Sequence, residues 1–244
     1  MKLAILTLCL ALPIATAQSA HADATCTESR QGKLNGDSLY TVINKDAGKQ
    51  LSPEYVPPSL AKIPTEFLSP LAPQNQQLRA SAIAAFAKMH QAAADQGIKL
   101  FIRSAYRSFD DQCRTFASKV GKFSAQFSSK ERGLSYARKI SAEPGRSQHQ
   151  LGTTMDIVFP ELSYDFSITK ADKTTSFRWL DERAQDFGFI MSFPFADDDA
   201  EDFGYNAATG YFFEPWHWRY VGVKQAKAFR ASHLLPDAFL QTLN

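Results

Sequence analysis

The stretch SQHQLGTTMDI, residues 147–157, places a histidine and an aspartate seven positions apart, with a glycine between them. Seven residues separate two side chains by about 10 Å along a helix axis and by more than about 20 Å in a straight strand. Two ligands of one zinc ion lie only about 3–4 Å apart. A shared metal therefore requires a turn between His149 and Asp156, and Gly152 tolerates the backbone angles of such a turn. The alternative is a capping aspartate and an unrelated surface histidine.

A second stretch near the C-terminus, FEPWHWRYVG at 213–222, contains another histidine. If residues 216–221 form a strand, their side chains alternate between two faces. Three large aromatic residues then share the face that suits a hydrophobic core, namely Trp216, Trp218 and Tyr220. His217 shares the opposite face with Arg219 and Val221, and we expect that face to border a cleft.

His149, Asp156 and His217 together form a set of two histidines and one carboxylate. A catalytic zinc ion is typically held by three protein ligands and a water molecule, whereas a structural zinc usually has four protein ligands. The set therefore favours a catalytic zinc site, provided that the fold brings the three side chains together.

A zinc hydrolase also needs a base. Zinc lowers the pKa of its bound water to about 7, and a nearby carboxylate takes the proton as the water attacks a carbonyl. Glu214 is the candidate base, because no other glutamate lies so close in the sequence to an expected ligand. The alternative is a surface carboxylate beside Pro215.

The chain around these motifs predicts an α+β fold. Abundant alanine, apolar residues at helical spacing and a stop at Gly97 predict a helix within 75–97, and Ser108 is a candidate cap for a second helix. Further helices are expected over 129–140, over 176–187 with Ser176 as the cap and Gly188 as the stop, over 223–232, and after Pro236. Strands are expected over 98–104, 153–159, 189–195 and 216–222. The expected architecture is a small, mainly antiparallel sheet with helices packed on it and the zinc site in a cleft at the sheet.

The first 24 residues have the pattern of a secretory signal peptide. Lys2 is followed by an apolar run from Leu3 to Ile14 and then by small residues. The run is shorter than the roughly 20 residues that span a bilayer. We therefore expect a protein secreted across the inner membrane, periplasmic or extracellular, with no stable membrane span.

After cleavage the chain is expected to have an N-terminal extended arm, residues 25–75, and one domain, residues 76–244. The arm is rich in proline, which disfavours helix. It is expected to wrap the domain and to bury five apolar residues: Leu51, Tyr55, Val56, Leu60 and Phe67. Cys26 and Cys113 would be the two remaining cysteines, and in an oxidising compartment we expect them to form a disulfide. The alternative is two separate thiols.

The overall charge limits the possible partners. The formal net charge is only +2, whereas a nucleic-acid-binding domain would carry a strong basic bias. We therefore expect no nucleic-acid partner, and we expect the protein to be a monomer.

Three segments, in this order along the chain, resemble the VanY-like family of zinc D-alanyl-D-alanine carboxypeptidases, which also includes L,D-carboxypeptidases. They are SAYRSFDDQ at 104–112, SQHQLGTTMDI at 147–157 and EPWHWRYVG at 214–222. The resemblance implies a zinc peptidase that trims peptidoglycan stem peptides. It also implies that His149, Asp156 and His217 bind the zinc ion and that Glu214 is the catalytic base.

Three further residues match family positions near the substrate. The resemblance implies that Arg107 binds substrate or stabilises developing charge, and the planar fork of donors in arginine suits a carboxylate or an oxyanion. The alternative for Arg107 is a surface arginine in a turn. Gln112 and Ser147 match polar positions close to the substrate.

One segment departs from the family pattern. Residues 195–210, FADDDAEDFGYNAATG, form a longer and more acidic stretch than the resemblance implies. A solvated loop is the simplest interpretation, and a second cation site or a reshaped substrate groove are the alternatives. Residues 159–175 are expected to form another loop beside the site.

The leading hypothesis is a carboxypeptidase that removes a C-terminal D-alanine from peptidoglycan stem peptides. An L,D-carboxypeptidase and a peptidoglycan endopeptidase are variants within the same fold. A non-catalytic cell-wall-binding module is a different class, which would be marked by loss of a ligand or of the base, and neither is missing. A secreted domain that needs no metal is the third class.

Overall fold

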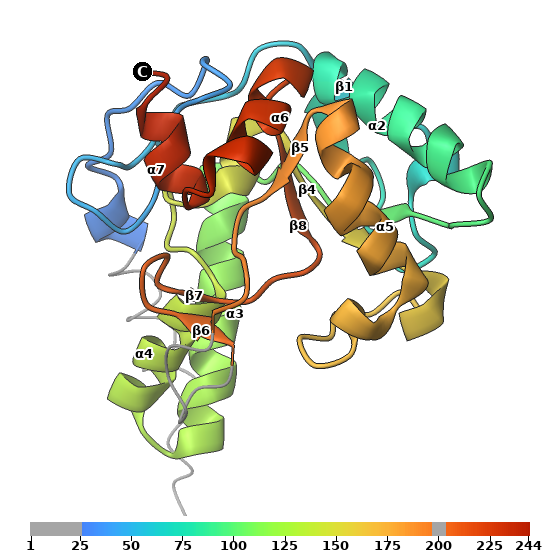
Figure 1. Cartoon of the computed structure of the whole chain (residues 1–244). Helices are drawn as coiled ribbons and strands as arrows, with labels where there is room; N and C mark the ends of the chain where they lie inside the picture. The colour runs from blue at the N-terminus through green and yellow to red at the C-terminus, as the bar shows by residue number, and fades with distance from the viewer. Residues whose placement is uncertain (1–25, 197–203) are drawn as a thin grey trace, which may run out of the picture.

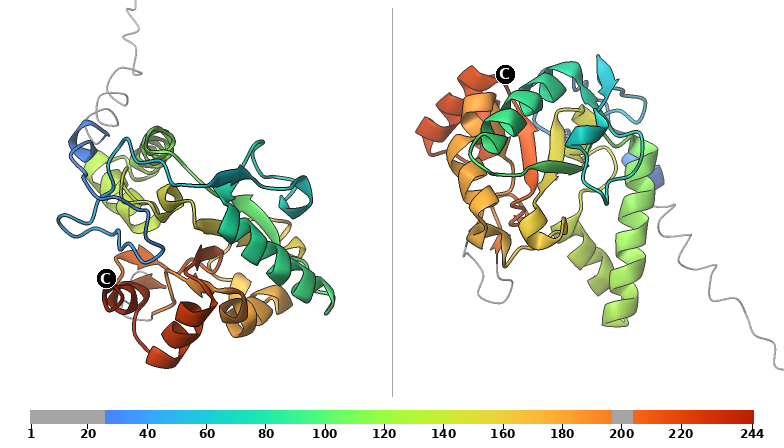
Figure 2. Two further views of the ribbon diagram at one scale, coloured as in Figure 1. Left: turned by 90° about the horizontal axis from the view of Figure 1, so that it is seen from above. Right: turned by 90° about the vertical axis from the view of Figure 1, so that its right-hand side faces the viewer.

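The computed structural model describes residues 26–196 and 204–244 and confirms an α+β fold (Figures 1 and 2). The predicted signal peptide and the acidic residues 197–202 lie outside the described residues. No helix within the described ranges is long and apolar enough to span a membrane.

A four-stranded antiparallel sheet lies at the centre, in the order β3-β4-β8-β5. The strands are β3 (Phe101–Ser104), β4 (Thr154–Val158), β8 (His217–Tyr220) and β5 (Phe189–Met191). The register places Asp156 of β4 opposite Ser104 of β3 on one side and His217 of β8 on the other. The sheet thus brings three segments that are far apart in the sequence to one position.

Alternation along the strands separates two faces of the sheet. Met155, Ile157 and Trp218 belong to the main hydrophobic core, which they share with residues of α2 (Ala80–Ala94) and α5 (Thr175–Arg183). Because Asp156 lies between Met155 and Ile157 in β4, its carboxylate points to the opposite face. The buried apolar face therefore fixes the direction in which the polar side chains point.

The face that carries His217 is only partly open, in contrast to the expectation from alternation. Arg219 is fully buried, and its Nη2 donates to the carbonyl oxygens of Leu39 and Thr41, both at 2.8 Å. Val221 is buried in a second apolar cluster with residues of α6 (Val223–Ser232) and α7 (Pro236–Gln241). The N-terminal arm and the C-terminal helices therefore cover the rest of this face.

The arm is mostly irregular, as predicted, with a strand β1 (Leu60–Lys62) that pairs with β2 (Gln77–Arg79) and a 3₁₀ turn η1 (Thr65–Phe67). Leu51 and Tyr55 are buried, whereas Leu60 and Phe67 are half-buried. The burial predicted for Val56 is wrong, since its side chain is 64% exposed. Tyr55 and Pro57 point inward on either side of it, so the extended chain directs Val56 outward.

Helices α3 (Phe109–Phe127) and α4 (Lys130–Ile140) form an antiparallel hairpin that projects away from the sheet (Figures 1 and 2). Ser108 caps α3 by accepting a hydrogen bond from the Asp111 amide, as predicted, and Ser129 caps α4 in the same way. A disulfide joins Cys26 of the arm to Cys113 of α3, with a Cα–Cα distance of 5.6 Å. It ties the start of the arm to the base of the hairpin.

Several element boundaries differ from the sequence predictions. Helix α5 is capped by Thr174, whose side chain accepts from the Phe177 amide, and not by Ser176. The Ser176 hydroxyl instead binds the carboxylate of Glu161. After α5 a 3₁₀ segment, η5 (Ala184–Phe187), leads to Gly188, which ends it with a φ of 90° as predicted. Strand β5 ends at Met191 and not at 195.

The two predicted loops contain short regular elements. The segment 159–175 includes the 3₁₀ turns η3 (Pro160–Leu162) and η4 (Ala171–Lys173). Within 204–212 a small hairpin is formed by β6 (Tyr205–Asn206) and β7 (Tyr211–Phe212). This hairpin was not predicted, because its strands are too short to show a sequence period.

Candidate active site

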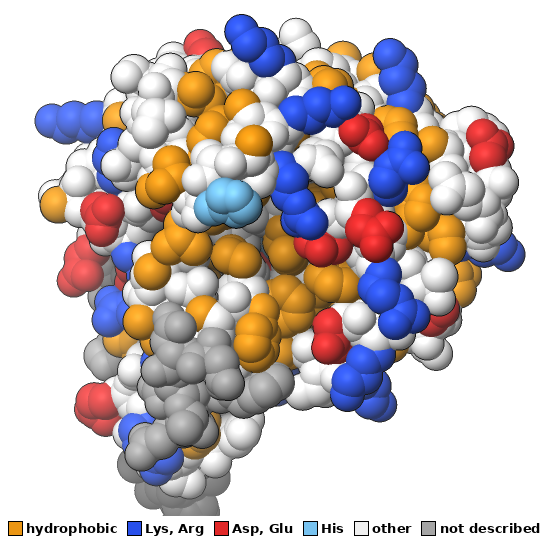
Figure 3. All heavy atoms as spheres, in the orientation of Figure 1, with side chains coloured by type: hydrophobic (Ala, Val, Ile, Leu, Met, Phe, Trp, Pro, Cys, Tyr) orange, Lys and Arg blue, Asp and Glu red, His pale blue; other side chains and the backbone are white. Residues whose placement is uncertain are grey.

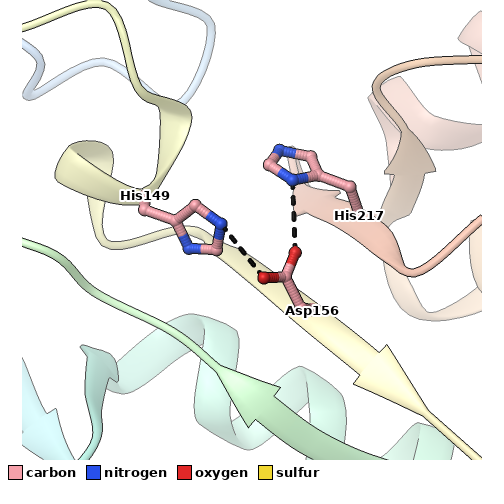
Figure 4. A group of neighbouring side chains, drawn as sticks. All are labelled: His149, Asp156 and His217. Carbon is pink, nitrogen blue, oxygen red and sulfur yellow. Dashed lines mark ion pairs between the residues drawn. The ribbon is translucent and has the colours of Figure 1, made fainter. Parts of the chain in front are cut away.

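His149, Asp156 and His217 converge on one point, as Figure 4 shows. Their potential ligand atoms all lie within 4.8 Å of one another. His149 Nε2 is 3.4 Å from Asp156 Oδ2, and His217 Nδ1 is 3.3 Å from Asp156 Oδ1. All three side chains are buried, so the convergence is built into the interior of the fold.

The turn predicted at Gly152 produces this geometry. His149 lies in the 3₁₀ segment η2 (Gln148–Leu151), which ends at Gly152 with a φ of 66°. A Cβ at this position would come within 2.8 Å of Pro57 in the arm. Glycine is therefore required both for the left-handed backbone and for the close approach of the arm.

The hydrogen bonds of His149 define which of its nitrogens faces the centre. Its Nδ1 lies 2.6 Å from the carbonyl oxygen of Ala105, an acceptor only, so Nδ1 carries the proton and donates. Nε2 is then left with a lone pair that points at Asp156. A backbone carbonyl that orients a histidine in this way is a common outer partner in metal sites.

The donor set fits a divalent metal such as zinc. Asp156 Oδ1 is buried and accepts no well-formed hydrogen bond from the described part of the chain, although His217 Nδ1 lies 3.3 Å away. A buried carboxylate oxygen that is left in this way is costly unless a cation binds it. Burial lowers the pKa of His217 to about 4, which keeps the imidazole neutral, the form that binds metal. Two neutral imidazoles and one carboxylate are the ligand types that zinc prefers.

Glu214 lies beside the three potential ligands. Its Oε2 is 3.4 Å from His217 Nδ1, and its side chain is 12% exposed. Burial, together with the negative charge of Asp156, raises the pKa of Glu214 well above its usual value, while Arg107 and Lys119 oppose the rise. A carboxylate in this position and with a raised pKa suits proton transfer.

Arg107 is held at the same site by a small side-chain network. Its Nη1 donates to Gln112 Oε1 at 2.7 Å, and its Nη2 donates to Ser104 Oγ at 3.2 Å. Its backbone amide donates to the carbonyl of His149 at 3.3 Å. Burial lowers the pKa of Arg107, and the carboxylates of Asp156 and Glu214 raise it, so the guanidinium faces the acidic side of the site.

Gln112 and Ser147 are both buried next to these groups. The amide of Gln112 is used at both ends, because Oε1 accepts from Arg107 and Nε2 donates to the carbonyl of Ala142 at 2.5 Å. Gln112 therefore positions Arg107. Ser147 precedes η2 at its N-cap position, without a side-chain capping bond. Contact of either residue with substrate stays a prediction.

Two supports of the site were missed by the sequence analysis. Ser104 reaches Arg107 because the register of β3 shifts between Ile102 and Ser104, an irregularity that the sequence does not mark. Ser192 follows β5, where its amide donates to the carbonyl of His217 and its hydroxyl donates to Gln148 Oε1 at 2.6 Å. It thereby links the segments that carry His149 and His217.

A hollow lies beside Phe213, the residue before Glu214. It has a volume of about 410 Å³ and is lined by apolar side chains, among them Phe177 and Met191, and by the charged side chains of Asp172, Lys173 and Asp181. Figure 3 shows hydrophobic side chains gathered in the middle of this face, with charged side chains around them. Trp216, on the other side of Glu214, packs on Phe166 with the ring centres 4.9 Å apart. The base thus lies between a buried phenylalanine and an aromatic pair.

Comparison with known proteins gives consistent matches. A family model, VanY, described as D-alanyl-D-alanine carboxypeptidase, matches residues 75–223. YodJ of Bacillus subtilis strain 168 is 30% identical over 208 residues, which is 85% of this chain and 68% of YodJ. The structure of the LdcB LD-carboxypeptidase has a TM-score of 0.66 at 27% identity and covers 86% of this chain and 98% of LdcB. The structure of VanYB in complex with D-alanine-D-alanine has a TM-score of 0.65 at 25% identity, and the match covers 84% of this chain and 99% of VanYB.

Proposed function

Because the chain belongs to the VanY family of D-alanyl-D-alanine carboxypeptidases, we propose that it is a zinc carboxypeptidase that removes the C-terminal D-alanine from peptidoglycan stem peptides. The observation that carries the proposal is the convergence of His149, Asp156 and His217 with Glu214 beside them. A wall-binding module would not need the base, and a domain without metal would not need three buried ligands aimed at one point.

Zinc would be held by His149 Nε2, an Asp156 oxygen and His217 Nδ1. When bound there, it supplies a Lewis acid and an activated water to the scissile amide. The imidazole of His149 is fixed by the Ala105 carbonyl, and the segment of His217 is fixed by its pairing with β4. These supports hold the ligands in place before the metal binds.

Glu214 is the proposed base and acid. Its carboxylate would take a proton from the attacking water and pass it to the leaving amine of D-alanine, which must be protonated to depart. The raised pKa suits this exchange, because a carboxyl group that both accepts and donates works best with a pKa close to the operating pH.

Arg107 is the proposed binder of negative charge. A C-terminal D-alanine carries a carboxylate, and the scissile carbonyl develops negative charge as it is attacked. A guanidinium held on two sides by Gln112 and Ser104 offers its remaining N–H groups in a fixed direction. It thus selects peptides with a free C-terminus, as a carboxypeptidase requires.

Cleavage between an L-centre and a D-residue is the second candidate. The similarity to the LdcB LD-carboxypeptidase is as close as the similarity to VanYB. Both reactions release a terminal D-alanine and use the same metal, base and arginine, so they differ only in the residue on the N-terminal side of the scissile bond.

We also propose that the protein acts outside the cytoplasm, in the periplasm or the extracellular space. The N-terminal sequence supports secretion, and a disulfide between Cys26 and Cys113 is consistent with an oxidising compartment. Fractionation of the native host, with detection of the processed N-terminus by mass spectrometry, tests this part. An unprocessed chain found only in the cytoplasm would contradict it.

The activity is tested with the purified protein and two synthetic stem peptides, a pentapeptide ending in D-Ala-D-Ala and a tetrapeptide ending in one D-Ala. We expect release of D-alanine from the pentapeptide, loss of release with a chelator and recovery with added zinc. Release from the tetrapeptide alone would favour L,D specificity. Failure to cleave either peptide at full zinc occupancy would contradict the proposal.

A further inference from the structure

The α3–α4 hairpin carries a charge that the proposed chemistry does not use. Over residues 109–140 the sequence has seven lysines and arginines and three aspartates and glutamates, a net charge of +4 in a chain whose total is +2. The remainder of the chain is therefore net acidic. The positive charge is concentrated on one projecting element and does not reflect the composition of the whole protein.

Three of these cations lie around the free end of the hairpin, and we call them the basic tip: Lys122, Lys130 and Arg132. Each is exposed. Nearer the body, Arg114 pairs with Asp111 and Arg138 pairs with Glu143. The three side chains of the basic tip are exposed to solvent, where a partner can approach them.

An aromatic seam between the two helices holds the basic tip in place. Tyr136 of α4 packs against Phe123 and Phe127 of α3, with ring centres 4.7 Å and 5.4 Å apart. The guanidinium of Arg132 lies 5.0 Å from the centre of the Phe127 ring, and the ammonium of Lys122 lies 5.6 Å from that of Phe123. Both charged groups therefore lie over the rings of the seam, while the two residues remain exposed.

The hairpin also leads from the active site to the basic tip. Gln112, which positions Arg107, and Lys122 are ten residues apart in α3, about 15 Å along the helix axis. An extended peptide of five residues spans roughly 17 Å. Lys119, which lies between Gln112 and Lys122 in α3, is exposed as well. A polymer with one stem peptide in the site can therefore reach the tip.

We propose that the basic tip is a docking surface for a polymer that carries carboxylates, namely the peptidoglycan strand whose stem peptides the active site trims. The choice of polymer rests on the proposed function, since the stem peptides that the active site would trim carry carboxylates. Single exposed ion pairs are weak, so the attraction comes from several contacts and from the field of the hairpin as a whole. It falls with salt, because the Debye length shortens from about 10 Å at 0.1 M to about 3 Å at 1 M.

The test compares two triple variants that remove the same charge. The first is K122Q/K130Q/R132Q, and its matched control is K62Q/K88Q/K99Q, whose lysines are exposed on other parts of the surface. Each protein is sedimented with purified insoluble peptidoglycan at 0.1 M and 1 M salt, in the presence of a chelator so that no cleavage occurs. Thermal unfolding of each variant confirms that the fold is retained.

We expect the bound fraction at 0.1 M salt to fall at least fivefold for the tip variant and less than twofold for the control. The difference should vanish at 1 M salt, and wild-type binding should fall on peptidoglycan whose carboxylates have been amidated. The proposal would be overturned if both variants bound peptidoglycan as well as wild type, or if both lost binding to the same extent. It would also be overturned if wild-type protein bound amidated and unmodified peptidoglycan equally. Stronger retention on anionic lipid vesicles than on peptidoglycan would identify a membrane as the partner and would also overturn it.

A second readout separates this proposal from the proposed function. A soluble tripeptide ending in D-Ala-D-Ala spans only about 10 Å when extended and cannot reach the basic tip while bound in the site. On this substrate the tip variant should keep a kcat/KM within twofold of wild type. If the wild type cleaves no stem peptide but sediments through the tip, the proposed function fails and the docking surface remains. If cleavage is normal but wall binding does not depend on the tip, only the docking surface fails.

Discussion

Two regions of the site lie side by side: the metal centre, formed by His149, Asp156 and His217, and the arginine corner, formed by Arg107 with Ser104 and Gln112. Different interactions hold them in place. Asp156 and His217 sit opposite each other in paired strands, and His149 follows a turn that is locked by Gly152 against the arm. Arg107 instead follows β3 in irregular chain, and its guanidinium depends on the side chains of Ser104 and Gln112. Backbone pairing fixes the ligands, whereas side-chain hydrogen bonds fix the arginine.

This difference predicts different consequences of mutation. Changes in the arginine corner should alter substrate affinity and turnover and leave the metal in place. Changes to the three ligands should remove the metal. Glu214 lies next to the ligands but is neither a ligand nor a partner of Arg107. Its replacement should therefore separate metal binding from catalysis most clearly.

The largest effect on turnover at full metal occupancy is expected for Glu214→Gln. The amide keeps the shape but cannot accept the proton, and general acid–base catalysis contributes about 10²–10⁴-fold. Zinc content, measured by mass spectrometry of the metal, should remain at one ion per chain. The control is Glu182→Gln at an exposed position. Full activity of Glu214→Gln would refute the assignment of the base.

A somewhat smaller loss is expected for Arg107→Ala. Removal of a positioned donor to developing charge lowers the rate by about 10²–10³-fold. Arg107→Lys keeps the charge and loses the fork, so it should recover only part of this loss. Steady-state kinetics with a stem peptide measure both variants. If zinc were lost from either, the two regions would not be independent.

A further reduced effect is expected for Gln112→Leu, which removes the acceptor for Arg107 but keeps the volume. A hydrogen bond to a charged group is worth about 1.5–3 kcal/mol, which sets a loss of roughly tenfold or more in kcat/KM. Zinc content should not change, and Gln91→Leu on the exposed side of α2 serves as the control. A tenfold loss of kcat/KM in Gln91→Leu as well would show that the loss does not depend on the contact between Gln112 and Arg107.

Acid should destabilise the metal-free protein through His217. Burial lowers the pKa of this imidazole from 6.5 to about 4. Between these values the unfolded chain binds a proton that the folded chain does not, so the contribution of His217 to stability falls as the pH decreases through this window. The raised pKa of Glu214 acts in the opposite direction, and the two are separated by mutation. Urea unfolding of the chelator-treated protein at pH 7, 6 and 5 should show that wild type loses more stability, or gains less, than His217→Gln. Identical pH dependence of the two proteins would contradict the assignment.

The smallest effect on turnover is expected for the double variant C26S/C113S. The disulfide joins residues 87 positions apart and restrains mainly the unfolded chain, so its loss should cost about 2–4 kcal/mol of stability. Because neither cysteine is a metal ligand, the base or a hydrogen-bond partner of Arg107, kcat/KM at 25 °C should stay within twofold. A large drop in kcat/KM without a drop in Tm would show that the disulfide shapes the active site.

Much of the fold and the candidate site could be predicted because local physics specifies it. Capping by Ser108 and the left-handed turn at Gly152 each depend on one residue and its neighbours. The direction of Asp156 follows from the apolar residues on either side of it. The motif resemblance then joined segments that no local rule connects.

What could not be predicted depends on contacts between distant segments. Thr174 and Ser176 are both suitable caps, and only the approach of Glu161 decides that Ser176 is engaged elsewhere. Alternation alone placed Arg219 on the face of a cleft, but the carbonyl groups of Leu39 and Thr41 bury it. The support of Arg107 by Ser104 depends on an irregularity of β3 that arises from pairing with β4.

The most direct test of the central claim is anomalous diffraction at the zinc edge from crystals of the zinc-loaded protein. The account predicts one strong peak about 2.0–2.2 Å from His149 Nε2, an Asp156 oxygen and His217 Nδ1, with no fourth protein ligand. A zinc peak at another position, or no peak between these three side chains at saturating zinc, would contradict it.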